Sequence, residues 1–308
     1  EPLLAELIRH GMSATADGCD LHCQGQLRSG DYVLPGDISS QFVSALLLAL
    51  PLLPGDSTLT LTSAPESAPY IAMTEEVLAA AGISLYRTGS RYRIPGGQRY
   101  RLPSHLTVEG DWSSAAFFLC AGAMSREGIA VDGLSLPTRQ GDSALLPLLR
   151  QMGAEINLSS GCITVRKGRL RATDIDARPI PDLIPPLSVL AAAAEGGSHI
   201  QNARRLRYKE SDRLQGIAEL LNSLGGCLTV DGDGLLIHGV SHLQGGTVDP
   251  MGDHRLAMSA ALAALSADAP VTVRDADCVS KSYPAFWADF QSLKGEAPCP
   301  APSETPFV

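Results

Sequence analysis

The stretch Gly110-Asp111-Trp112-Ser113-Ser114, which an apolar run follows, decides the fold because its pattern occurs four times along the chain. Each copy has an aspartate after Gly or Pro and then an apolar run of helix length. The four aspartates are Asp37, Asp111, Asp182 and Asp253, at intervals of 74, 71 and 71 residues. Such regular spacing predicts a protein built from internal repeats of about seventy residues.

Each repeat predicts an αβαββ unit preceded by a strand, with Asp or Ser as the N-cap of the first helix and Gly as the C-cap of the second. The expected first helices are 42–51, 115–123, 187–194 and 256–265. The strands expected after them are 57–61, 129–131, 198–201 and 271–273, and the expected second helices are 77–82, 145–153 and 217–225. The strand pairs that should close the units are 83–87 with 92–95, 155–158 with 162–166, and 227–230 with 235–238.

The two ends of the chain follow the pattern only in part. The second half of a repeat is recognisable at the start of the chain, in residues 3–11, 13–16 and 20–23. The pattern therefore predicts that the chain, which starts with Glu1, begins inside a repeat. Residues 283–293 are the expected final helix, and 296–308 are Pro-rich without helical or strand periodicity. We interpret residues 102–109 as a linker and candidate hinge between two units.

Composition excludes several classes of protein. With 44% hydrophobic and 19% charged residues, the 308-residue chain is typical of a soluble globular protein of about two domains. The apolar runs 42–53 and 187–194 are shorter than the roughly 20 residues that a bilayer requires, and no secretory signal is visible. The net charge of −9 argues against a nucleic-acid partner. Seven cysteines without a CxxC pair favour a reducing, cytoplasmic location.

A cluster of cations stands out on this acidic chain. Five of ten residues are basic, namely Arg204, Arg205, Arg207, Lys209 and Arg213. Because Lys209 and Arg213 are four residues apart, we expect them on one face of a helix. Arg255 and Lys281 also stand near expected helix starts, where backbone N–H groups favour phosphates. The alternative is a solvated surface turn with Lys–Glu pairs.

Four segments resemble the signatures of the 5-enolpyruvylshikimate-3-phosphate synthase family: 36–42 (GDISSQF), 108–115 (VEGDWSSA), 207–214 (RYKESDRL) and 252–258 (GDHRLAM). The resemblance covers about residues 1–294. It implies an α/β fold, the two-domain enolpyruvyl transferase fold, an inside-out α/β barrel with three repeats in each domain. By this count the expected organisation is an incomplete first domain at 1–107, a second domain at 108–294 and an unstructured tail at 295–308.

The resemblance also implies a reaction. The family transfers the enolpyruvyl group of phosphoenolpyruvate to the 5-hydroxyl of shikimate 3-phosphate and releases phosphate, in the shikimate pathway of aromatic amino acid biosynthesis. It uses no metal or organic cofactor, its partners are these small-molecule substrates, and its members are commonly monomeric. The family's N-terminal Lys and Arg and its Gly-rich loop have no counterpart in this sequence, so we expect this chain alone to be inactive.

Site residues follow from the resemblance position by position. The catalytic pair would be Asp182, as base on the attacking hydroxyl, and Glu210, as proton shuttle at the methylene. Shikimate 3-phosphate would be held by Ser39, Ser40, Gln41, Ser67, Asp182, Arg205 and Lys209, with a weaker contribution from Tyr70. Phosphoenolpyruvate would be held by Gln41, Arg213, Arg255 and Lys281. Two positions depart from the family: Arg205 stands where many members have Asn, and Ser67-Ala68-Pro69-Tyr70 replaces Ser-Lys-Pro-Tyr.

Alternatives remain for the individual residues and for the whole chain. Ser39, Ser40 and Asp182 could be simple helix caps, and His254 is interpreted as a structural turn residue rather than a base. Cys19, His22 and Cys23 resemble metal ligands, but a strand would point them apart, so we expect no metal site. The rival functions are UDP-N-acetylglucosamine enolpyruvyl transfer and non-catalytic anion binding by a remnant of the enzyme.

Overall fold

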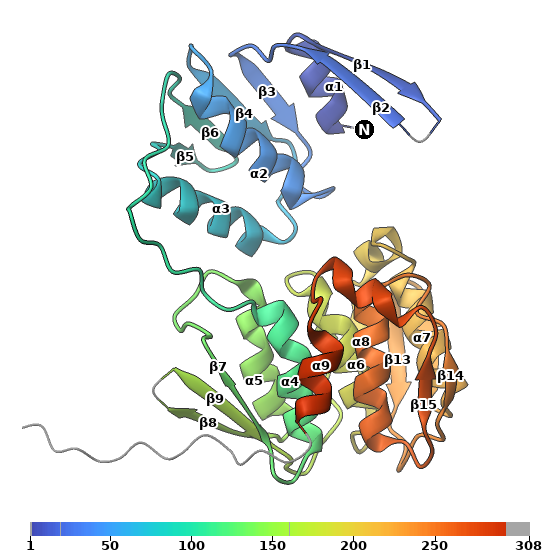
Figure 1. Cartoon of the computed structure of the whole chain (residues 1–308). Helices are drawn as coiled ribbons and strands as arrows, with labels where there is room; N and C mark the ends of the chain where they lie inside the picture. The colour runs from blue at the N-terminus through green and yellow to red at the C-terminus, as the bar shows by residue number, and fades with distance from the viewer. Residues whose placement is uncertain (1, 19, 160, 294–308) are drawn as a thin grey trace, which may run out of the picture. The chain divides into compact units, whose positions relative to one another are not determined.

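The computed structural model describes residues 2–18, 20–159 and 161–293. The expected tail at 295–308 lies outside them. The described residues divide into two compact units: unit 1 lies within 2–108 and includes 139–141, and unit 2 lies within 109–138 and 142–293 (Figure 1). Each unit is described by itself.

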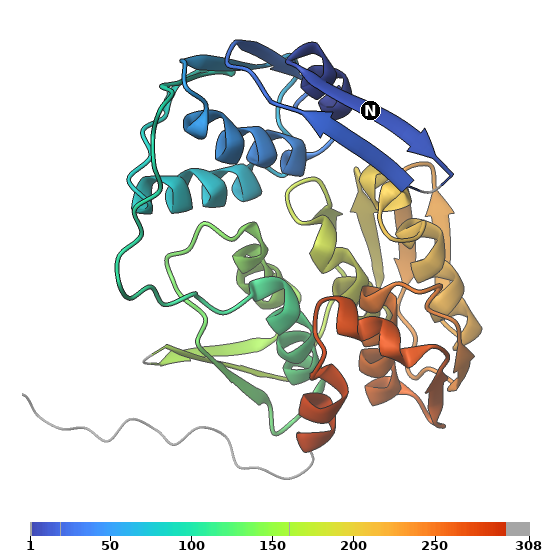
Figure 2. The same cartoon turned by 45° about the horizontal axis from the view of Figure 1, so that its top comes forward.

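Unit 1 begins with a helix and a hairpin and continues with one αβαββ repeat. The first part is α1 (Pro2–Arg9), β1 (Met12–Asp17) and β2 (Asp20–Gly25). The repeat is β3 (Asp31–Leu34), α2 (Ser40–Ala49), β4 (Ser57–Leu61), α3 (Ala68–Ala80), β5 (Tyr86–Thr88) and β6 (Arg91–Ile94). Helices α2 and α3 lie side by side against the sheet (Figures 1 and 2). Alternate residues of β3, β4 and β6 are buried beneath them, so one face of the sheet carries the core of this unit.

Unit 2 contains the remaining repeats. Its first repeat is α4 (Trp112–Met124), β7 (Ile129–Asp132), α5 (Leu145–Gln151), β8 (Glu155–Ser159) and β9 (Cys162–Arg166). The second is β10 (Ile175–Asp176), α6 (Ile184–Ala192), β11 (Gly197–Gln201), α7 (Arg213–Ser223), β12 (Cys227–Asp231) and β13 (Gly234–His238). The third is β14 (Gly246–Val248), α8 (His254–Ala263), β15 (Val271–Val273) and α9 (Phe286–Ser292). Short 3-10 helices join these elements, including η3 (Pro181–Leu183), η4 (Arg204–Tyr208) and η6 (Ala276–Lys281).

Strand order confirms the internal repeat. The sheet β3-β4-β6-β5 of unit 1 has the same order as β10-β11-β13-β12 of unit 2, and β7-β9-β8 follows that order from its second strand onward. In both four-stranded sheets the first two strands are parallel and the other pairs are antiparallel, and β14 and β15 are also parallel. Helices α2, α6 and α8 each connect the two strands of one parallel pair, because parallel strands need such a crossover connection.

Most of the expected helices and strands are present, and the differences have local causes. Helix α3 starts at Ala68 rather than near residue 77, because Pro69 in its first turn needs no N–H partner. Helix α6 starts at Ile184 rather than 187 for the same reason, with Pro185 and Pro186 in its first turn. The final helix α9 starts only at Phe286, because a proline at 284 disfavours a helical conformation in the residue before it.

Helix caps follow the expected chemistry in most repeats. Gly82, Gly153 and Gly225 end second helices with φ values of 76°, 94° and 82°, a left-handed conformation that favours glycine. Asp111 accepts the backbone N–H groups of Ser113 and Ser114 at the start of α4. Asp253 and Ser39 likewise cap α8 and α2, so these aspartate and serine positions fix where the first helices begin.

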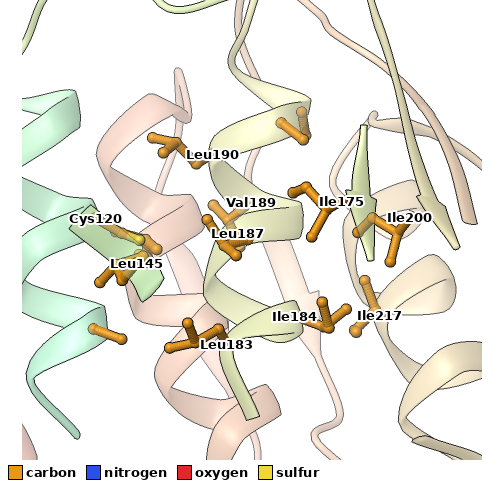
Figure 3. Close-up of a cluster of buried hydrophobic side chains, with 14 of the residues drawn as sticks. Cys120, Leu145, Ile175, Leu183, Ile184, Leu187, Val189, Leu190, Ile200 and Ile217 are labelled. Carbon is orange, nitrogen blue, oxygen red and sulfur yellow. The ribbon is translucent and has the colours of Figure 1, made fainter. Parts of the chain in front are cut away.

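Helix α6 forms the centre of unit 2. All nine of its residues are buried, and it packs against α4, α7 and α8. Figure 3 shows Leu187, Val189 and Leu190 of this helix among side chains from neighbouring elements, including Cys120, Leu145, Ile175, Ile200 and Ile217. Alanine and serine are frequent on α4, α6 and α8, and these small side chains allow the helix axes to approach closely.

In the described ranges, no helix combines the length and the apolar character that crossing a bilayer would demand.

Removing part of this core should destabilise unit 2. Leu187 is fully buried, so Leu187→Ala should lower the free energy of unfolding by ~2–5 kcal/mol through lost burial and the cavity that remains. Leu158→Ala is the matched control, because Leu158 is 47% exposed and its loss should change stability by no more than about 0.5 kcal/mol. Urea unfolding followed by tryptophan fluorescence reports on unit 2, which holds both Trp112 and Trp287. Equal losses in the two variants would contradict the assignment of α6 to the core.

Candidate functional site

Seven charged side chains of unit 2 meet at the starts of three helices. We call this group the ion cluster; it consists of Asp182, Lys209, Glu210, Arg213, Asp253, Arg255 and Lys281. Asp182 lies in η3 just before α6, Arg213 is the first residue of α7, and Asp253 caps α8. The helix starts come together because α6 packs against both α7 and α8 (Figure 1).

Arg213 is the centre of the ion cluster. Its side chain is only 1% exposed. Its guanidinium donates through Nε to Asp253 (2.7 Å), through Nη1 to Asp182 (2.8 Å) and through Nη2 to Glu210 (2.6 Å). A buried charge of this kind requires such partners, since desolvation without them would be costly. One arginine therefore connects carboxylates from three separate segments.

Asp182 collects the largest number of cations. Its Oδ1 lies 3.3 Å from the Lys209 ammonium and 2.8 Å from Arg213, and its Oδ2 lies 3.5 Å from Nη2 of Arg255. Burial would raise the pKa of Asp182, but the charges of Arg255, Lys209 and Arg213 outweigh it and hold the pKa well below its usual range. The interpretation of Asp182 as a helix cap is wrong: Leu183 holds the N-cap position of α6, and the carboxylate makes ion pairs instead.

Glu210 lies between two cations. Its Oε2 accepts from Arg213, and its Oε1 accepts from Lys281 at 3.0 Å. Burial raises the pKa of Glu210, but the Arg213 charge and the Lys281 hydrogen bond lower it to about 2. Glu210 is therefore an anion at neutral pH in this arrangement.

Lys209 lies in the loop before α7 and not on the helix, where the sequence predicted it. The expectation that Lys209 and Arg213 share a helical face is wrong, because α7 begins only at Arg213. Asp212 is its N-cap and accepts the Gln215 N–H at 3.1 Å, which leaves Lys209 in the loop before the helix. Both cations nevertheless contact Asp182.

Cations exceed carboxylates in the ion cluster by four to three. Lys281 is the most accessible, with its side chain 57% exposed, whereas the Arg255 side chain is largely buried. The positive ends of α6, α7 and α8 add to this charge. Such an arrangement favours small anions that carry phosphate or carboxylate groups.

Sequence reasoning missed the role of Asp253 in this cluster. Its side chain is 0% exposed; Oδ1 caps α8 through the Arg255 N–H, while Oδ2 accepts from Arg213 and from the Ser211 hydroxyl at 3.1 Å. The only available signal was its place in the repeat, which indicates a cap but no ion pair. Its neighbour His254 is the first residue of α8 and is buried, and burial lowers its pKa below the ordinary value.

Arg205 lies on η4, four residues before Lys209, and is partly exposed.

The expected site residues of unit 1 gather at the starts of α2 and α3. Ser39 caps α2 and Ser40 is buried, while Gln41 is exposed in the first turn. Ser67 precedes α3 in a left-handed conformation, with φ of 54°. The two helix starts are neighbours, because the Glu66 N–H donates to the Gly36 carbonyl at 3.2 Å. Capping therefore describes Ser39, but it does not describe the buried Ser40.

The described residues contain no group of three or more His, Cys, Asp or Glu side chains that could hold a metal ion. Cys19, one of the three residues that resembled metal ligands, lies outside the described residues.

Comparisons with known proteins agree on one family. Residues 12–290 match the family model described as EPSP synthase (3-phosphoshikimate 1-carboxyvinyltransferase). A 3-phosphoshikimate 1-carboxyvinyltransferase from Clostridium kluyveri is 43% identical over 279 residues, which are 90% of this chain and 65% of that protein. One from Methanocorpusculum labreanum is 39% identical over 295 residues, 95% of this chain and 69% of that protein.

Solved structures agree with these relatives. A structure of EPSP synthase from Acinetobacter baumannii matches with a TM-score of 0.76 and 28% identity, over 96% of this chain and 71% of that chain. The chain thus spans 65% of the length of the Clostridium kluyveri relative and 71% of the length of this solved structure.

The ion cluster should make stability depend on acid pH. Since the folded-state pKa of Glu210 is about 2 against an ordinary 4.5, ionised Glu210 stabilises the fold above pH 4.5, and this contribution is lost as the pH falls toward 2. The free energy of unfolding in urea should therefore fall more steeply with acidification in the wild type than in Glu210→Gln. Glu155→Gln, on the exposed end of β8, should retain the wild-type slope. A Glu210→Gln slope equal to that of the wild type would show that the cluster does not hold this carboxylate ionised.

Proposed function

The chain belongs to the EPSP synthase family, and from this premise we propose that its ion cluster binds phosphoenolpyruvate and shikimate 3-phosphate and carries out enolpyruvyl transfer with release of phosphate. The observation that carries the proposal is the convergence of four cations and two partly exposed carboxylates, Asp182 and Glu210, on the starts of α6, α7 and α8. All six are residues whose positions match the family's motifs.

Phosphoenolpyruvate would bind to Arg213, Arg255 and Lys281. Arg255 is suited to this, because its guanidinium contacts Asp182 only at long distances, 3.4 Å to the backbone carbonyl and 3.5 Å to the carboxylate, and so can turn its paired N–H groups toward a phosphate or carboxylate. Arg213 is engaged by three carboxylates, but each Nη carries a second N–H that an anion could accept. Lys281 is exposed and would add a mobile point charge.

Asp182 would accept the proton of the attacking hydroxyl. In the present arrangement three cations stabilise its anion, which makes it a weak base. Phosphorylated substrates would draw Lys209 and Arg255 toward their own oxygens. The pKa of Asp182 would then rise, because fewer cations would face it, and the carboxylate would become a better base at the moment the hydroxyl is present.

Glu210 would move a proton at the methylene carbon of phosphoenolpyruvate. Its two cation partners, Arg213 and Lys281, are the ones proposed to bind this substrate. When they turn to the substrate's phosphate and carboxylate, the pKa of Glu210 would rise from about 2 because the opposite charges have new partners. The proposed role therefore requires substrate binding before proton transfer.

Unit 1 would contribute to the binding of shikimate 3-phosphate. Ser39, Ser40, Gln41 and Ser67 match the family's positions and stand at neighbouring helix starts. Hydroxyl groups and the N–H groups of the first turn of α2 are suitable partners for a phosphate. We propose this role for unit 1 by itself. Lys209, Asp182 and Arg205 of unit 2 are proposed separately, from the family's motifs, as contacts to shikimate 3-phosphate.

Loss of Arg255 should weaken phosphoenolpyruvate binding. Arg255→Ala should reduce the binding free energy by ~1.5–3 kcal/mol, the contribution of a hydrogen bond to a charged group. Calorimetric titration of the 308-residue chain measures this, and Arg169→Ala is the matched control because Arg169 pairs with Glu195 on the surface, outside the cluster. Equal affinity of wild type and Arg255→Ala would remove Arg255 from the site.

We propose that turnover needs a longer protein than this chain; about a third of the Clostridium kluyveri relative has no counterpart in the match. We expect the chain alone to release no phosphate from the two substrates. A fusion with the unmatched part of the Clostridium kluyveri relative should be active, and Glu210→Gln in this fusion should lower kcat by ~10²-fold with a much smaller change in KM. Normal kcat in that variant would exclude Glu210 as proton shuttle. Substrate binding by a fusion without turnover would favour the anion-binding alternative.

A further inference from the structure

The side chain of Arg207 closes the loop that carries Lys209 and Glu210. We call its contacts with Asp212, Gly232 and Asp233 the clasp. Arg207 and Asp212 stand at the two ends of the four residues 208–211, and Nη1 of Arg207 donates to Oδ2 of Asp212 at 3.1 Å. The Nη2 group of Arg207 donates to the carbonyl of Gly232 at 2.7 Å, and its Nε lies 3.7 Å from Oδ1 of Asp233. One side chain thus ties both ends of the loop to the turn between β12 and β13.

Asp212 connects this clasp to helix α7. Its other oxygen, Oδ1, accepts the Gln215 N–H at 3.1 Å and so caps the helix. A second bond supports the same attachment, from the Ala203 N–H to the Asp233 carbonyl at 2.7 Å. The loop is therefore anchored on one side to a β-hairpin and on the other to the helix whose first residue is Arg213.

Residues 209–211 of the loop need such anchors, because they follow η4 and lie in neither helix nor strand. Lys209 has extended backbone angles, φ −89° and ψ −154°, after the end of η4. Ordering a loop residue in one conformation costs about 1–2 kcal/mol of conformational entropy. Contacts at the two ends of the loop reduce the number of backbone conformations that it can adopt. They therefore restrict the directions in which the side chains of Lys209 and Glu210 point.

We propose that Arg207 is a positioning residue, which holds the 208–211 loop so that Lys209 faces Asp182 and Glu210 faces Arg213 and Lys281. Its guanidinium is directed at Asp212, Gly232 and Asp233, and its side chain is 30% exposed. These three partners lie within the protein, so the effect of Arg207 on a substrate passes through the loop. The importance of this role for catalysis rests on the proposed function, but the ordering of the loop does not.

Three variants separate the clasp from general stability. Arg207→Ala removes it, Arg207→Lys keeps a charge but loses the planar fork, and Asp212→Asn weakens the ion pair while an asparagine still caps α7. Arg169→Ala is the matched control, because it deletes an arginine from a 2.9 Å ion pair with Glu195 at a site where the Arg169 side chain is 70% exposed. Asp212→Asn and Arg207→Lys remain informative if Arg207→Ala fails to fold.

The first measurements need no substrate. In the 308-residue chain, amide hydrogen exchange at residues 208–212 should be about tenfold faster in Arg207→Ala than in the wild type, with intermediate values in the other two clasp variants. In carbon-13 NMR of labelled glutamates, assigned with Glu210→Gln, the titration midpoint of Glu210 should rise in the same order. Arg169→Ala should match the wild type in both. Unchanged exchange and an unchanged Glu210 midpoint in Arg207→Ala would overturn the inference.

Phosphoenolpyruvate titration distinguishes this inference from the proposed function. If both hold, Arg207→Ala should bind about 3- to 10-fold more weakly than the wild type, and Arg207→Lys should recover part of the loss. If the wild type binds and Arg207→Ala binds equally well, the positioning role is overturned while the function stands. If the wild type itself does not bind, the proposed function fails, and hydrogen exchange and the Glu210 midpoint still decide whether Arg207 holds the loop.

Discussion

The arrangement of unit 2 around its site depends on one buried guanidinium. Arg213 cannot be accommodated at 1% exposure without partners, and its partners come from three segments: Asp182 before α6, Glu210 in the preceding loop and Asp253 at the start of α8. Removing one partner of a buried charge costs about 3–5 kcal/mol, because the charge left behind has lost its compensation. The hydrogen bonds of Arg213 therefore fix the first turns of α6, α7 and α8 relative to one another.

The repeat explains how these segments come to meet. Each repeat has an aspartate before its first helix. The local backbone conformation determines whether its side chain caps the helix or forms ion pairs. Asp111 and Asp253 have extended backbone angles at the N-cap, so their side chains fold back onto the first turn. Asp182 sits within the 3-10 turn η3, one residue earlier than the cap, and its carboxylate points to the cations instead. Equivalent positions of the repeat thus hold a helix cap, Asp111, and an ion-pair acceptor, Asp182. Asp253 has both functions.

Sequence reasoning could reach the order of helices and strands because local rules decide it. Gly82, Gly153 and Gly225 mark helix ends by their conformational freedom, and apolar runs mark the buried helices. It missed the early starts of α3 and α6, where prolines open the helix rather than end it. It also placed Lys209 on a helix and overlooked the ion pair of Asp253. The error at Lys209 is local, because Asp212 caps α7 and the helix begins only at Arg213. The ion pair of Asp253 with Arg213 joins residues 40 positions apart, which periodicity within one segment cannot indicate.

The ion cluster also limits how an anion can bind to it. Arg213, Arg255 and Lys281 already have carboxylate partners, so a phosphate or carboxylate would share these cations with Asp182 and Glu210 or displace them, rather than meet bare cations. Part of the attraction for a ligand is spent on breaking these pairs, which reduces affinity relative to an array of unpaired cations. The displaced carboxylates lose the charges that depress their pKa values, so anion binding must increase their affinity for protons. In the proposed function, anion binding and proton uptake would thus be coupled through the same side chains. This coupling is the physical requirement for a site in which a carboxylate is ionised before its ligand arrives and becomes an effective acid or base only after the ligand is in place.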